Sequence, residues 1–152
     1  MNALTLLKDD HDDIKKLLSK ADETTERAVK TRNALLHEIG VKLTAHEKIE
    51  EDIFYPALKA HPKAKDIVLE GYQEHHVVDL IMGELQSLDE SDETWGAKFS
   101  VMKENIEHHI EEEEGEMFTK ARAAFSAGEL DELGEQMQAM KETILTSSLT
   151  SR

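Results

Sequence analysis

Six residues of this chain combine two kinds of metal-binding side chain at helical spacing. They are His11, His46, Glu50, His75, His109 and Glu113. Two of the histidines are followed four residues later by a glutamate, a spacing that places both side chains on one face of a helix. Imidazole and carboxylate groups are typical ligands of iron, manganese and zinc. The pattern therefore indicates a metal site to which several helices contribute.

Each of the six residues interrupts a stripe of apolar residues that recurs in alternating steps of three and four, as on the buried face of a helix. The four stripes lie within residues 2–21, 26–59, 63–88 and 94–125. Beyond the two glutamates, the stripes continue to Ile53 and Ala57 and to Glu116. Gly71 falls on the third stripe, where the lack of a side chain allows another helix to approach closely.

A bound cation is the counter-charge that such a core needs. Burying a carboxylate is costly unless the group is paired or binds a cation. A single core histidine is usually explained by hydrogen bonding alone. Four histidines at matched depth, two of them with partner glutamates, are better explained by a shared metal site.

The chain contains an internal repeat. Residues 46–56 and residues 109–119 share the pattern His-x3-Glu-Glu-x2, followed by an apolar and an aromatic residue. The first and second helical stretches therefore resemble the third and fourth, as two hairpins related by a pseudo-twofold axis. Such symmetry suits a centre of two metal ions in which each hairpin supplies two histidines and one glutamate.

The stripe and the repeat agree on which of two adjacent histidines faces the core. His75 falls on its stripe and aligns with His11, whereas His76 does neither. His109 is selected over His108 in the same way. We therefore expect His76 and His108 to lie outside the site.

The expected fold is all-α: an up-down-up-down antiparallel four-helix bundle with a short C-terminal fifth helix. Short connections between long helices favour antiparallel neighbours. The bundle should span residues 1–126, an amphipathic helix residues 127–145, and a frayed tail residues 146–152. The apolar stripe of the fifth helix must pack on the bundle or on a partner, so a monomer and a homodimer both remain open.

Composition excludes several classes of function. The formal net charge of −15 disfavours nucleic acid and anionic membrane surfaces as partners. The absence of cysteine excludes disulfides, iron–sulfur clusters and thiolate zinc sites. With neither a signal peptide nor an apolar run of membrane-spanning length evident, the simplest expectation is a cytoplasmic protein.

The number of ligands points to more than one metal ion. Six ligands exceed the four that a structural zinc ion accepts, and two glutamates able to bridge favour a dinuclear site. Ligand chemistry alone leaves iron, manganese and zinc open.

With these residues in this order, the sequence resembles the hemerythrin family, specifically the bacterial HHE cation-binding domains, over about residues 3–126. The resemblance rests on His11, His46-x3-Glu50-Glu51, Tyr55-Pro56, Glu74-His75-His76, His109-x3-Glu113 and Met117-Phe118. It implies two iron ions (Fe2+/Fe3+), bridged by the two glutamates and by an oxo or hydroxo group. It also implies chemistry with oxygen, nitric oxide or peroxide, or the handling of iron.

The sequence departs from the oxygen-carrying members of that family. They have a second histidine four residues after the ligand that corresponds to His75, where this chain has Asp79. They also bridge with His-x4-Asp, where this chain has His-x3-Glu. The resemblance then implies one iron that keeps an open position or takes Asp79 or water, and Glu47 is a further candidate ligand.

The expected function is a non-haem di-iron protein that binds or senses a small ligand, namely oxygen, nitric oxide or peroxide. An open iron suits this role better than stable oxygen carriage. The alternatives are a di-iron enzyme that decomposes peroxide or acts as an oxidase, and a protein for iron storage or iron-centre repair. The sequence identifies no catalytic residue.

Overall fold

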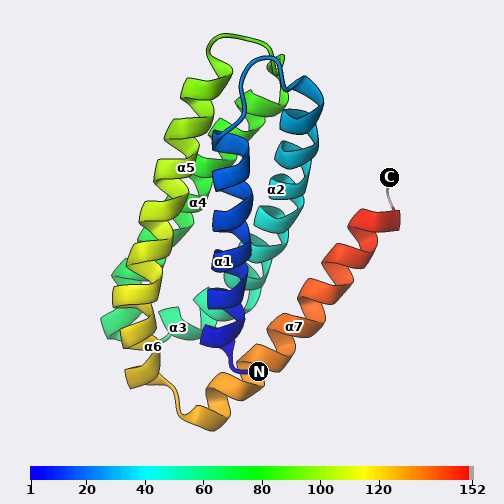
Figure 1. The fold of residues 1–152 in the computed structure, drawn as a ribbon. Helices are drawn as coiled ribbons and strands as arrows, with labels where there is room; N and C mark the ends of the chain where they lie inside the picture. The colour runs from blue at the N-terminus through cyan, green and yellow to red at the C-terminus, as the bar shows by residue number, and fades with distance from the viewer. Residues whose placement is uncertain (151–152) are drawn as a thin grey trace.

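The computed structural model describes the backbone of residues 1–150 and the side chains of residues 1–147, and the described chain is all-helical, as predicted. The helices are α1 (Ala3–Asp22), α2 (Val29–Ile49), α3 (Tyr55–Lys59), α4 (Lys65–Gln86), α5 (Trp95–Glu112), α6 (Phe118–Ala124) and α7 (Ala127–Thr150). The four long helices α1, α2, α4 and α5 lie side by side (Figure 1). Among the described residues, no helix has the length and apolar character needed to cross a bilayer.

Two π-helical segments interrupt the predicted second and fourth helices. Segment η1 (Glu50–Phe54) joins α2 to α3, and segment η3 (Glu113–Met117) joins α5 to α6. A π turn contains one more residue than an α turn and is frequent at functional sites. Each segment begins at one of the two predicted bridging glutamates.

The extra residue of each π turn shifts the buried stripe by one position. Ile53 and Ala57, predicted on the stripe, are only half-buried, whereas Phe54 is fully buried. The placement of Glu116 on the stripe is wrong, because its side chain is exposed and the neighbouring Met117 is buried. Heptad spacing assumes an uninterrupted α-helix, and therefore missed this shift.

The apolar core is divided in two by the layer that contains the histidines. One cluster includes Leu7 and Phe54, and the other includes Ile14 and Phe99. On α1, His11 lies between Leu7 and Ile14, one turn from each. The two clusters hold the four long helices together above and below a polar layer.

The C-terminal helix is longer than predicted and packs on the rest of the chain. Helix α7 runs to Thr150, so residues 146–150, expected to be frayed, are helical, and residues 151 and 152 lie outside the described part. It packs against α1 and α2, running obliquely past the N-terminus of the chain (Figure 1), and buries Leu130 and Met137 in the first cluster. At Gly134 an added Cβ would clash with the Met1 carbonyl oxygen, so the two backbones are in direct contact.

Candidate metal centre

The structure brings all six predicted residues into one buried layer. The histidines come one each from the four long helices, and the glutamates are the first residues of the two π segments. Each of the six residues is more than nine-tenths buried. Their side chains form two groups of candidate ligands that share Glu50. We call these groups the first and the second position.

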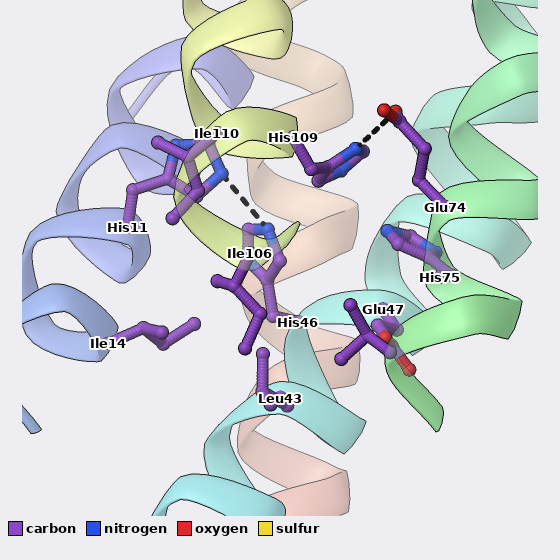
Figure 2. A pocket seen from close by; sticks show the side chains of 11 residues that line it. His11, Ile14, Leu43, His46, Glu47, Glu74, His75, Ile106, His109 and Ile110 are labelled. Carbon is purple, nitrogen blue, oxygen red and sulfur yellow. Dashed lines mark hydrogen bonds and ion pairs between the residues drawn. The ribbon is translucent and has the colours of Figure 1, made fainter. Parts of the chain in front are cut away.

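The first position is formed by His11, His46, Glu50 and Glu113. The Nε2 atoms of His11 and His46 are 3.2 Å apart (Figure 2). Glu113 Oε1 lies 3.1 Å from His11 Nε2, and Glu50 Oε1 lies 3.2 Å from His46 Nε2. Two imidazole nitrogens and two carboxylate oxygens therefore converge on one point.

The second position is formed by Glu50, His75 and His109. Glu50 Oε1 is 3.1 Å from His75 Nε2, and so contacts a histidine of each position. Glu113 Oε2 is 3.1 Å from His109 Nε2, while its other oxygen faces the first position. Each glutamate thus contacts histidines of both positions, as a bridging carboxylate must.

The outer nitrogen of each histidine is held by a second carboxylate, and these four carboxylates form a ring around the layer. The pairs are His46 Nδ1 with Asp10 (3.0 Å), His75 Nδ1 with Glu51 (2.8 Å), His109 Nδ1 with Glu74 (2.7 Å) and His11 Nδ1 with Glu114 (2.7 Å). Going around the four helices in order, each carboxylate comes from the helix before that of its histidine, or from the π segment that continues that helix. Such partners fix the tautomer and orientation of metal-binding histidines.

These outer carboxylates were not predicted as partners of the histidines, although the repeat contains a signal for them. An acidic residue directly precedes His11 and His75, and another directly follows Glu50 and Glu113. Acidic residues are so frequent in this chain that such neighbours are expected on a solvated face. Only the geometry of the layer distinguishes them.

Charged neighbours within the layer strongly shift the pKa values of its buried side chains. Burial opposes the charged form of His46, but Glu50 and Asp10 hold its pKa well above the usual range. Burial likewise favours the neutral acid of Glu113, yet hydrogen bonds with Glu50, His109 and His11 hold its pKa well below the usual range. The buried carboxylates thus draw positive charge into the layer.

Tyr55 contributes a hydroxyl group at the second position. The hydroxyl donates a hydrogen bond of 2.8 Å to Glu113 Oε2 and lies 3.4 Å from the Nε2 atoms of His75 and His109. Burial and the charge of Glu113 raise the pKa of Tyr55 well above its usual range, so the phenol stays protonated. The group that approaches Gly71 closely is the Tyr55 side chain, because a Cβ added at Gly71 would lie 2.9 Å from the hydroxyl oxygen.

A small, mainly apolar cavity of about 20 Å³ adjoins both positions, which is room for one water-sized ligand (Figure 2). Besides the four histidines, side chains from all four long helices line it, including Ile14, Leu43, Val78 and Ile106. Glu47 and Glu74 also line the cavity. The cavity therefore combines apolar walls, imidazoles and two glutamate side chains.

Asp79 and Glu47, the two additional candidate ligands, lie outside both groups. Their side chains are hydrogen-bonded to each other, and burial together with Asp79 raises the pKa of Glu47 to about 10. Asp79 is exposed and borders a surface hollow with His76. The position that holds a histidine in oxygen carriers is thus turned away from the layer.

The remaining histidines lie away from the centre. His37, His76 and His108 are exposed, and His108 Nε2 is 3.0 Å from Glu112. His108 and Glu112 form a third, more exposed group of candidate ligands together with Glu74. The predicted choice of His75 over His76, and of His109 over His108, agrees with the buried groups.

The donor atoms of the layer fit a pair of cations. Among the described residues, Glu50 Oε2 is buried and has no hydrogen-bond partner, while Glu113 Oε1 is buried beside His11 Nε2, 3.1 Å away. A buried carboxylate oxygen without a partner costs about 1–3 kcal/mol or more, and a bound cation removes that cost. Because the four Nδ1 atoms face outer carboxylates, the four Nε2 atoms remain as inward ligands.

An all-helical fold around paired histidine and glutamate clusters defines a helical cation-binding domain. A model of the hemerythrin HHE cation-binding domain matches residues 2–121. The chain belongs to this family.

Relatives in mycobacteria extend the similarity over nearly the whole chain. Uncharacterized proteins of Mycobacterium tuberculosis and Mycobacterium bovis are 31% identical over 98% of this chain and 91% of their own length. The crystal structure of a hemerythrin HHE cation-binding domain-containing protein from Mycobacterium kansasii superposes with a TM-score of 0.87. It is 32% identical and covers 99% of this chain and 91% of the other.

Proposed function

We propose that the four long helices form an up-down-up-down bundle around two iron ions, and that this di-iron centre binds or senses a small ligand such as oxygen, nitric oxide or peroxide. The observation that carries the proposal is the pair of donor groups sharing Glu50, with a small cavity beside them. The proposed ligands of the metals are His11, His46, Glu50, His75, His109 and Glu113.

The donor set supports two irons bridged by carboxylates. Glu50 and Glu113 contact histidines of both positions, and each position receives two imidazoles. Nitrogen and oxygen ligands without thiolate suit iron, which commonly takes up to six ligands. Two imidazoles and two bridging carboxylates leave room on each metal for a solvent-derived bridge and an external ligand. When bound, such a centre supplies electrons and open coordination sites.

The cavity supports a ligand of one or two heavy atoms. A volume of about 20 Å³ excludes organic substrates. Apolar residues such as Ile14 and Val78 keep competing water away, while the outer carboxylates hold the imidazoles in place. Because Asp79 is bonded to Glu47 rather than turned inward, the second position keeps the opening that favours sensing or reactivity over oxygen carriage.

One observation favours the alternative, an enzyme that decomposes peroxide. Glu47 places a carboxyl group in the cavity wall, where it can exchange a proton with a bound ligand. Tyr55 hydroxyl, near the second position, is a further hydrogen-bonding group for the same task.

Metal analysis and spectroscopy of the iron-loaded protein test the proposal. Elemental analysis should give two irons per chain, and the reduced protein should develop a reversible visible band on exposure to oxygen or nitric oxide. Sustained oxygen release from peroxide would favour the enzyme. At most one metal ion per chain would contradict the di-iron centre.

A further inference from the structure

One of the four outer carboxylates, Asp10, forms a close ion pair with a lysine of the C-terminal helix. Asp10 accepts a hydrogen bond from His46 Nδ1 through Oδ2, and its other oxygen forms an ion pair with the Lys141 ammonium group. Of the other three outer carboxylates, Glu114 has Lys8 Nζ at the longer distance of 4.0 Å, and the described residues place no lysine or arginine nitrogen within 4.0 Å of Glu51 or Glu74. The contact links the C-terminal helix to a residue that orients a predicted metal ligand.

Helix α7 also shields this carboxylate from solvent. The side chain of Asp10 is 8% exposed, compared with 22% for Glu114, 29% for Glu74 and 36% for Glu51. Because Asp10 is the most buried of the four, the loss of its cation has the largest electrostatic effect. Despite its burial, bonds from His46 and Lys141 hold the pKa of Asp10 below its usual range.

The position of Lys141 is fixed by the packing of α7. Gly134 lies seven residues before Lys141, two helical turns away on the same face. Its backbone contacts Met1–Ala3 so closely that no side chain fits between them. The lysine therefore reaches Asp10 from a rigidly seated helix.

We propose that Lys141 is a positioning residue of the first metal position and that α7 is part of the metal centre. Lys141 holds Asp10 against His46, and Asp10 holds the imidazole with Nε2 directed at the first position. The inference rests on the proposed di-iron function. Without the ammonium group, Asp10 is free to turn toward solvent, and His46 loses the partner that orients it.

The test measures release of iron(II) from the full-length protein, loaded without oxygen, into an excess of a chelator that forms a coloured complex. Removing an outer partner of a metal ligand typically weakens metal binding 10–100-fold. Lys141 acts on such a partner, Asp10, rather than on the ligand itself, so Lys141→Met should release one iron per chain up to about tenfold faster, and the other iron at the wild-type rate. Lys141→Arg, which keeps the charge, should restore most of the retention.

Two further variants test whether the faster release is specific to Lys141 and to one of the two metal positions. Lys48→Met removes a lysine that also borders α7, beside Met140, but is paired with exposed Asp52, and it should change neither rate. Glu74→Gln weakens the corresponding partner of His109, and should accelerate the other iron instead. The double variant Lys141→Met/Glu74→Gln should then accelerate both irons.

Gly134→Ala provides an independent route, because it displaces α7 while keeping the lysine, and it should accelerate the same single iron as Lys141→Met. Equal acceleration of both irons by Lys141→Met, or no change, overturns the inference while the di-iron function stands. A wild-type chain that takes up fewer than two irons contradicts the proposed function, and with it the inference.

Discussion

The two hairpins, α1–α2 and α4–α5, supply the same candidate ligands but surround them differently. His11 and His46 of one hairpin correspond in the repeat to His75 and His109 of the other. Beside the second position lies Tyr55, stacked on His75 with ring centroids 5.4 Å apart. The corresponding residue at the first position is Phe118, which stacks on His11 at 6.3 Å and has no hydroxyl group.

The helices next to these aromatic rings differ accordingly. Gly71 on α4 makes room for the Tyr55 hydroxyl, whereas the repeat places Leu7 at the corresponding position of α1. Conversely, α7 packs on α1 and α2, and its Lys141 reaches Asp10 of the first position. Among the described residues, the second position thus has a phenol and no lysine nitrogen within 4.0 Å of its outer carboxylates, whereas the first position has lysine contacts and no phenol.

Two similar metal positions require symmetry of the candidate ligands and not of the residues around them. Two similar metal positions need matched imidazoles and shared carboxylates. The residues around them are free to make one position different from the other, which suits a centre where a ligand binds at one metal. We expect variants of shared residues to affect both positions, and variants of the surroundings to affect one.

The largest effect is expected at the two shared glutamates. Glu50→Ala or Glu113→Ala removes an oxygen from both positions, so elemental analysis should find the iron content falling from two per chain toward zero. His46→Ala and His109→Ala each affect a single position and should leave close to one iron. If Glu113→Ala retains one iron, Glu113 is not a shared ligand and the symmetric description of the centre fails.

The sequence predicts which six residues come together in the buried layer, because they follow two regular patterns at once, the apolar stripe and the repeat. It does not predict the π segments, because an added residue in a helix turn leaves no local pattern, and Glu116 was consequently misplaced. The surface on which α7 packs is not predicted either, because its apolar stripe requires burial without specifying what covers it. The structure identifies that surface through the contact of Gly134 with the N-terminal backbone.

The next largest effect is expected from Tyr55→Phe in the metal-free protein. The change removes a hydrogen bond to a buried carboxylate, and bonds to charged groups contribute about 1.5–3 kcal/mol. The free energy of unfolding in urea should fall by about that amount. Tyr72→Phe is the matched control, because its hydroxyl makes a longer bond of 3.4 Å and the side chain is only part-buried. Equal losses in the two variants would show that the Glu113 contact contributes nothing specific.

A related difference is expected between two glycines of α4. Gly71→Ala forces a methyl group against the Tyr55 hydroxyl, and such overpacking costs about 1–3 kcal/mol. At Gly83 an added Cβ meets nothing within 4 Å, so Gly83→Ala should stabilise the helix by up to about 1 kcal/mol. Urea unfolding of both variants should give changes of opposite sign. If Gly71→Ala is also stabilising, Tyr55 is less firmly placed than its contacts indicate.

The smallest effect is expected at the start of α7. Ser126 and Glu129 form a reciprocal capping box, with Ser126 Oγ accepting from the Glu129 amide at 3.1 Å and Glu129 accepting from the Ser126 amide at 2.9 Å. Ser126→Ala should lower the free energy of unfolding by about 1 kcal/mol, whereas Ser100→Ala, within α5, should change it little.

The cap of α7 can also be tested through the rate of iron release and through the pH dependence of stability. Because α7 packs on the first hairpin, Ser126→Ala should modestly accelerate loss of one iron, the same one that Lys141→Met affects.

Bonds from Ser126 lower the pKa of Glu129. The contribution of Glu129 is therefore present above its unfolded-state pKa and is lost as the pH falls through its lowered folded-state value. Acidification should then narrow the stability gap between wild type and Glu129→Ala, whereas a constant gap would show that the glutamate takes no part in the cap.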